Sequence, residues 1–122
     1  MGNTILVADD SASMRQFISF TLKGAGYQVT EAIDGADAVE KIKNNKINMV
    51  ISDLNMPNMD GMELLKYLRG HDSFKFTPVV MLTTESGKSR VLEAKNAGIN
   101  GWIIKPFEPK KLTDVVKKLL PK

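Results

Sequence analysis

The sequence predicts a single α/β domain in which a parallel β-sheet is covered by helices on both faces. Short apolar runs alternate along the chain with longer stretches in which apolar residues recur every three or four positions. The runs are continuously apolar, which is typical of parallel strands buried on both faces. At 122 residues, with 43% hydrophobic and 25% charged residues, the chain suits one domain spanning residues 1–122.

Five apolar runs are the predicted strands, and no linker, repeat or low-complexity segment separates them. They lie at Ile5–Ala8, Tyr27–Ala32, Ile47–Ser52, Val79–Thr83 and Trp102–Ile104. A stretch with helical spacing follows each run, so the chain is predicted to consist of five strand–helix units.

The helices are predicted from this spacing and from the residues that begin or end them. The first begins at Ser11 and ends near Gly24 and Gly26, whereas the fifth opens at Pro109. The second opens at Asp34-Gly35, the third follows Gly61 and the fourth ends at Ala97-Gly98. The positions that define the spacing are Met14, Phe17, Ile18, Thr21, Leu22 and Ala25, then Ala38, Val39 and Ile42, then Leu64, Leu65 and Leu68, then Val91, Leu92 and Ala94, and finally Leu112, Val115, Val116 and Leu119.

Polar residues that could carry chemistry stand at the ends of the predicted strands. Asp9 and Asp10 follow the first strand, Asp53 follows the third, Thr83 ends the fourth and Lys105 follows the fifth. In a doubly wound parallel sheet the functional site lies outside the carboxyl ends of the strands. Three acids gathered there would repel one another, so the pattern predicts a bound cation.

The acids suit Mg²⁺, which prefers a few carboxylates together with other oxygen ligands and water. Asp10 and Asp53 could bind the ion directly, with a backbone carbonyl near Asn55, and Asp9 could bind it directly or through water. The ion would let an anionic phosphoryl group approach, and Asp53 could then attack phosphorus to give an aspartyl phosphate. Lys105 and the Thr83 hydroxyl could contact the phosphoryl oxygens.

Each of these residues, taken singly, also has a purely structural interpretation. Asp9-Asp10 could cap the first helix, and Asp53 could form an Asx-type turn with the residues after it. Lys105 could be a surface lysine, and Thr83-Thr84 could simply be β-branched residues at a strand end. The site hypothesis therefore depends on all of them occurring together.

Taken together, these motifs resemble those of response-regulator receiver domains, in particular the single-domain chemotaxis type. The resemblance runs from about Thr4 to Leu120 and implies a flavodoxin-like sheet with strand order 2-1-3-4-5. The motifs that carry it are Asp9-Asp10, Asp53 with Met56-Pro57-Asn58-Met59-Asp60-Gly61, Leu82-Thr83-Thr84 and Lys105-Pro106-Phe107.

The resemblance implies a role for each matching position. Asp53 matches the phosphoacceptor, and Asp9 and Asp10 match the acid pair that holds Mg²⁺, with Asp10 the closer ligand. Asn55 matches the residue whose main-chain carbonyl completes the metal shell. Thr83 matches the switch hydroxyl, and Lys105 matches the lysine that pairs with the phosphoryl group, usually before a cis bond to proline.

Three further positions bear on how the switch would work. Trp102 stands where the family has a switch aromatic, commonly Tyr or Phe, and it could equally be a fixed packing residue whose N–H needs a partner. Asn55 and Glu85 lie two positions beyond Asp53 and Thr83, where the family tunes hydrolysis. This pair matches chemotaxis regulators and implies a short-lived phosphoryl group.

We expect a phosphorylation switch in chemotaxis or flagellar motor control, with a sensor histidine kinase as phosphodonor. No attached output domain is expected after the fifth helix, so output would come from docking of a motor-switch or other protein. The expected docking face is the fourth helix, fifth strand and fifth helix, including Lys88, Arg90, Lys95 and Trp102. A single-domain phosphorelay intermediate or phosphate sink is the alternative, and a separate phosphatase is a further candidate partner.

Two other classes are disfavoured by residues at the predicted site. Dehalogenase-type phosphatases, which use an aspartyl nucleophile, need a second Asp as acid/base where this chain has Asn55, so we expect a phosphoacceptor regulator rather than an enzyme. A dinucleotide-binding domain needs glycines after the first strand, where this chain has Asp9-Asp10-Ser11-Ala12.

Composition and charge disfavour nucleic acid and membranes as partners. The net charge is only +3, and the terminal lysines, without interleaved aromatic residues, predict a solvated helix face rather than a nucleic-acid surface. There is no cysteine, no apolar stretch of membrane-span length and no signal peptide, so we expect a cytoplasmic monomer. The terminal lysines of the predicted solvated helix face are Lys110, Lys111, Lys117, Lys118 and Lys122.

Overall fold

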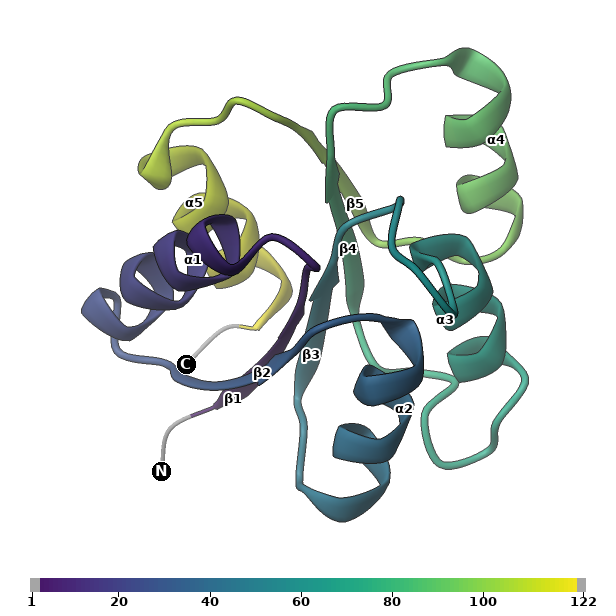
Figure 1. Cartoon of the computed structure of the whole chain (residues 1–122), viewed down its shortest axis with the longest axis horizontal. Helices are drawn as coiled ribbons and strands as arrows, with labels where there is room; N and C mark the ends of the chain where they lie inside the picture. The colour runs from purple at the N-terminus through teal and green to yellow at the C-terminus, as the bar shows by residue number, and fades with distance from the viewer. Residues whose placement is uncertain (1–2, 121–122) are drawn as a thin grey trace.

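The structure is a computed structural model that describes residues 3–120, in which strands and helices alternate strictly along the chain (Figure 1). Lys122, the last of the terminal lysines, lies outside the described residues. The elements are β1 Thr4–Ala8, α1 Ala12–Gly24, β2 Gln28–Ala32, α2 Gly35–Asn44, β3 Met49–Ser52, α3 Gly61–Arg69, β4 Val79–Thr83, α4 Lys88–Asn96, β5 Gly101–Ile104 and α5 Pro109–Leu119.

The strands form one parallel sheet in the order β2-β1-β3-β4-β5, which confirms the predicted fold. Ala8 at the end of β1 pairs with Ala32 on one side and with Ser52 on the other. The chain therefore winds in one direction from β1 to β2 and in the other from β3 to β5. The switch point lies between the carboxyl ends of β1 and β3, which is where sheets of this kind bind ligands.

Helices cover both faces of the sheet, α1 and α5 on one face and α2, α3 and α4 on the other (Figure 1). Successive strand residues point to opposite faces, so Ile5 and Val7 pack with α1 and α5 whereas Leu6 and Ala8 pack with the other three helices. Because both faces are buried, the inner strands β1, β3 and β4 are apolar at almost every position, whereas the edge strand β2 carries Gln28, Thr30 and Glu31 and is largely not buried. This is the physical origin of the continuous apolar runs in the sequence.

Side chains cap three of the helices that begin at the carboxyl edge of the sheet. Ser11 accepts a hydrogen bond from the backbone N–H of Met14, and Asp34 and Asp60 cap α2 and α3 in the same way. Asp60 and Glu63 form a reciprocal capping box. These caps fix the points where the loops around the candidate site enter the helices.

The helical spacing predicted the helices correctly but not all of the buried residues. Phe17 on α1 is 41% exposed and Leu92 on α4 is 57% exposed, although both follow the apolar spacing. On α4, Ala94 is the buried residue, because this short helix contacts the rest of the domain along a narrow stripe. Among the described residues, no helix combines the length and apolar character that a membrane span requires.

Candidate functional site

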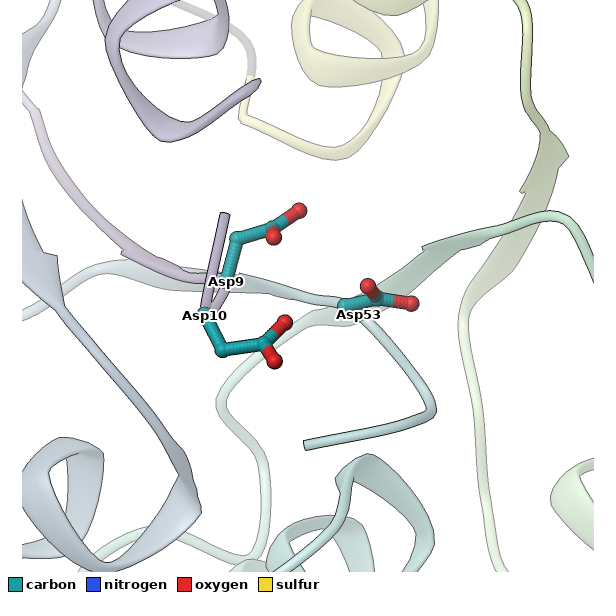
Figure 2. Close-up of side chains that lie close together, drawn as sticks. All are labelled: Asp9, Asp10 and Asp53. Atoms are coloured by element: carbon teal, nitrogen blue, oxygen red, sulfur yellow. The ribbon is translucent and has the colours of Figure 1, made fainter. Parts of the chain in front are cut away.

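Asp9, Asp10 and Asp53 meet at the switch point of the sheet (Figure 2). Each offers a carboxylate oxygen that lies within 4.8 Å of the others. The backbone N–H of Asp9 donates to Ala32 O (3.1 Å) and that of Asp53 donates to Ala8 O (2.9 Å). Sheet-type hydrogen bonding thus continues one residue past β1 and β3 and holds both acids in place.

Asp9 is buried, with 1% of its surface exposed, and is fixed by its neighbours. Its Oδ1 accepts a hydrogen bond from the backbone N–H of Ser11 (2.9 Å), and its main-chain oxygen accepts one from Arg15 Nη1 (2.7 Å). The residue that caps α1 is Ser11 itself, so Asp9 supports the turn before the helix without being the cap. Its second carboxylate oxygen faces the site.

Lys105 reaches this site from the end of β5 and pairs with two of the acids. Its Nζ lies 3.0 Å from Asp9 Oδ2 and 3.2 Å from Asp53 Oδ2, and its side chain is only 12% exposed. Burial acts to lower the pKa of Lys105, but the hydrogen bond to Asp9 and the charges of both acids outweigh it and raise that pKa. The interpretation of Lys105 as a surface lysine is therefore wrong. The bond from Lys105 to Pro106 is cis.

The site suits a divalent cation by both charge and ligand type. Three carboxylates and one ammonium leave a formal charge of −2, which one divalent ion would balance. The donors are all hard oxygens, the type that Mg²⁺, Ca²⁺ and Mn²⁺ prefer. Asp10 is exposed, so an ion could enter from solvent.

The β3–α3 loop, residues 53–60, carries Asp53 and Asn55. Asp53 Oδ1 accepts a hydrogen bond from the backbone N–H of Leu54 (2.7 Å), the next residue, whereas an Asx-type turn would use the N–H two residues on. Asn55 lies on the exposed side of the loop two residues later. The carboxylate is thus fixed on one oxygen by its own loop, while the other contacts Lys105.

Thr83, Glu85 and Trp102 are linked by hydrogen bonds that join the end of β4 to β5. Thr83 is buried at the end of β4, and its Oγ1 accepts a hydrogen bond from the backbone N–H of Glu85 (3.2 Å). Trp102 Nε1 donates to the carbonyl oxygen of the same residue, Glu85 (2.9 Å). The indole N–H therefore has its partner in the loop after β4, and the ring packs on the core beneath α4.

Sequence reasoning missed two side chains, Arg15 and Asn58, that support the site from outside it. Arg15 spans from the Asp9 carbonyl to Glu31 on β2, where its Nε lies 3.1 Å from Oε1. Asn58 bonds to Asp34 at the start of α2. The available signals were weak, namely the place of Arg15 one helical turn after Ser11 and the place of Asn58 within a motif that had already been noted.

Comparison with known proteins agrees with this geometry. Residues 5–117 match the model of the response regulator receiver domain. The chain is 43% identical over 118 residues to chemotaxis protein CheY1 of Helicobacter pylori, covering 95% of each chain. It is 41% identical to a chemotaxis protein CheY homolog of Campylobacter jejuni, over 95% of this chain and 91% of the relative.

Solved structures give the same result at the level of the fold. Chemotaxis protein CheY4 of Vibrio cholerae superposes with a TM-score of 0.93 at 42% identity, covering 98% of this chain and all of the other. Receiver domains bind a divalent metal at the acidic pocket formed here by Asp9, Asp10 and Asp53. The chain therefore belongs to the response-regulator receiver domain family and is a phosphoacceptor regulator rather than a true enzyme.

Proposed function

We propose that this protein is a chemotaxis-type phosphorylation switch in which Asp53 accepts a phosphoryl group from a phosphohistidine of a sensor histidine kinase. The observation that carries the proposal is the contact of Lys105 with both Asp9 and Asp53 inside the acidic pocket. This arrangement holds one carboxylate beside a fixed positive charge and beside oxygens suited to a metal. Similarity to named chemotaxis proteins along almost the whole chain supports the chemotaxis role.

The proposed metal is Mg²⁺, held by Asp10, Asp53 and the main-chain carbonyl of Asn55, with Asp9 binding directly or through water. When bound, Mg²⁺ would neutralise charge on the transferring phosphoryl group. The Asp53 carboxylate attacks phosphorus, the P–N bond to histidine breaks, and its electron pair stays on the imidazole nitrogen. Lys105 keeps its proton at neutral pH, since the neighbouring acids outweigh burial and raise its pKa rather than lower it, and its ammonium then pairs with a phosphoryl oxygen.

The proposed signal is a new hydrogen bond donated by the Thr83 hydroxyl. In this structure the Thr83 hydroxyl accepts a hydrogen bond from the Glu85 N–H. A phosphoryl oxygen on Asp53 offers this hydroxyl an acceptor, which favours a shift of the β4–α4 loop. Because Trp102 is bonded to Glu85, the shift changes the environment of Trp102 on β5.

The proposed output surface is formed by α4, β5 and α5. It exposes Leu92 (57%) and Ile104 (41%), with the exposed lysines Lys88 and Lys95 nearby on α4. Apolar side chains with a basic rim suit an acidic amphipathic segment, such as one from a flagellar motor-switch protein. Arg90 contributes less to this rim than the sequence predicted, because it pairs with Glu93 (3.1 Å).

Two measurements test the proposal. Incubation with a small phosphodonor and Mg²⁺ should raise the mass of the wild type by one phosphoryl group and leave Asp53→Asn unchanged. Labelling that persists in Asp53→Asn would contradict the assignment of Asp53. Titration of an acidic amphipathic peptide should show tighter binding to the phosphorylated protein, and equal affinities would exclude the switch.

A third measurement, which follows where the phosphoryl group goes, distinguishes the proposed switch from the alternative role as a phosphorelay intermediate or phosphate sink. A relay protein passes its phosphoryl group on to a second histidine domain, whereas the proposed switch loses it by hydrolysis. Asn55 and Glu85, which in this proposal tune that hydrolysis, favour the switch. We further propose that residues 1–122 form one monomeric, cytoplasmic domain.

A further inference from the structure

The β3–α3 loop is fastened to the rest of the domain at two points on either side of Asn55. At the first point, the backbone N–H of Gly61 donates to the carbonyl oxygen of the buried Leu54 (2.8 Å). At the second, the loop is bonded to the start of α2, where Asn58 Nδ2 donates to Asp34 Oδ2 (2.7 Å). The backbone N–H of Gly35 donates to the carbonyl of Met59 (3.0 Å) at the same place. The segment 55–57 thus spans two anchors.

Asp34 is a strong acceptor for the second anchor. It is buried, with 5% of its surface exposed, and its two oxygens have separate partners. Oδ1 caps α2 by accepting from the backbone N–H of Asp37 (2.8 Å), and Oδ2 accepts from Asn58. The backbone hydrogen bond from Asp37, followed by that from Asn58, lowers the pKa of Asp34, so the carboxylate is ionised and both bonds are charge-assisted.

The backbone around Asn58 is built for this contact. Asn58 has φ = 67°, in the left-handed region that Asn tolerates better than most residues. A Cβ added to Gly35 would clash with the main-chain oxygen of Met59, so only glycine lets the loop approach α2 this closely. A Cβ on Gly61 would clash in the same way with the main-chain oxygen of Asp53, which shows how tightly the loop closes on the phosphorylation site.

We propose that the Asp34–Asn58 pair is a positioning device for the metal site, because it sets the direction of the Asn55 main-chain carbonyl. The inference rests on the proposed function, in which that carbonyl is a Mg²⁺ ligand. Neither side chain of the pair needs to touch the metal. With the pair intact, segment 55–57 is held at both ends and has few conformations. Without the pair, the segment must be ordered when the ion binds, and the lost conformational entropy reduces the binding free energy. Loss of an outer contact of this kind weakens metal affinity by about 10-fold to 100-fold.

The test compares Mg²⁺ dissociation constants of variants, measured from the rise in unfolding midpoint with MgCl₂ at constant ionic strength. Asn58→Gly keeps the left-handed backbone accessible but removes the amide. Asp34→Ser keeps a capping oxygen for α2 but is too short to reach Asn58. Each change should raise the Mg²⁺ dissociation constant by about 10-fold. The matched control, Asn44→Gly at the exposed end of α2, should leave it unchanged even though it lowers stability.

The double variant separates the pair from two independent effects. If the residues act through their mutual hydrogen bond, Asp34→Ser with Asn58→Gly should weaken Mg²⁺ binding no more than either change alone. Wild-type affinity in both single variants, or fully additive losses in the double variant, would overturn the positioning role. If the wild type itself gains no stability from Mg²⁺, the metal site of the proposed function fails, and the positioning role fails with it.

Discussion

Replacing Lys105 with Met tests whether this lysine balances the acidic pocket. Met has a similar length but removes the ammonium that lies 3.0 Å from Asp9 and 3.2 Å from Asp53. At an effective dielectric constant of about 20, each contact contributes about 5 kcal/mol of gross attraction. Desolvation offsets most of this gain, and breaking a buried pair costs about 3–5 kcal/mol. Because Asp10 leaves the pocket open to solvent, we expect a loss of about 3 kcal/mol in metal-free buffer at pH 7.

Mg²⁺ should reduce that loss, because the variant pocket carries one more net negative charge and should bind the cation more tightly. The assay is urea unfolding followed by circular dichroism with and without Mg²⁺. With an m-value of about 2 kcal/mol/M, the loss corresponds to a midpoint about 1.5 M lower in metal-free buffer. The matched control is Lys111→Met on the exposed face of α5, which should change stability by less than about 0.5 kcal/mol. If Lys105→Met and Lys111→Met are equally stable without metal, or if Mg²⁺ leaves their difference unchanged, the charge-balance argument is refuted.

Three further predictions follow from contacts in the same structure. Because the pKa of Lys105 is raised on folding, its contribution to stability is complete below the unfolded pKa of 10.5 and is lost as the pH rises through the folded pKa. In urea titrations at alkaline pH, the stability difference between wild type and Lys105→Met should therefore close, and a difference that persists at the highest pH would contradict this. Trp102→Phe removes the bond to the Glu85 carbonyl and should cost about 1 kcal/mol and speed amide hydrogen exchange in the β4–α4 loop, whereas unchanged exchange would show that the bond does not hold the loop. Arg69→Lys breaks a guanidinium fork that donates to Asn100 Oδ1 (2.8 Å) and to three backbone carbonyls. Urea unfolding should show a loss of about 2 kcal/mol, and a neutral result would mean that water replaces the fork.

The fold could be predicted because both faces of the sheet are buried. Ile5 and Leu6 pack in different clusters, so neighbouring positions of β1 must both be apolar, and the run is visible in the sequence. The order of the strands could not be predicted from such runs, because the residues of an apolar run do not indicate which strands pair with it in the sheet. The order 2-1-3-4-5 came from the family resemblance and is confirmed by the pairing of the strands.

The acids and Lys105 could be predicted because a parallel sheet brings all its strand ends to one edge. Lys105 and Asp9 are 96 positions apart in the chain and still form a 3.0 Å contact. Arg15 and Asn58 could not be found in this way, because Arg15 donates to a main-chain carbonyl and Asn58 holds a loop through its bond to Asp34, the N-cap residue of α2. An Arg on a helix or an Asn in a loop is ordinary in sequence. The roles assigned to Asn55 and Glu85 in hydrolysis stay predictions.

The contacts of Glu85 have a consequence for how the timing of a signal can vary. The Glu85 N–H donates to the Thr83 hydroxyl, and the Glu85 carbonyl accepts from the Trp102 indole N–H. Glu85 therefore takes part in both hydrogen bonds through its main-chain atoms and not through its side chain. Its side chain instead accepts a hydrogen bond from the Gly87 N–H (2.9 Å). If the Glu85 side chain tunes hydrolysis as proposed, a substitution at position 85 would alter the lifetime of the phosphorylated form and leave these main-chain hydrogen bonds intact. Under that proposal, the duration of the signal and its transmission to β5 would be adjustable separately at one residue.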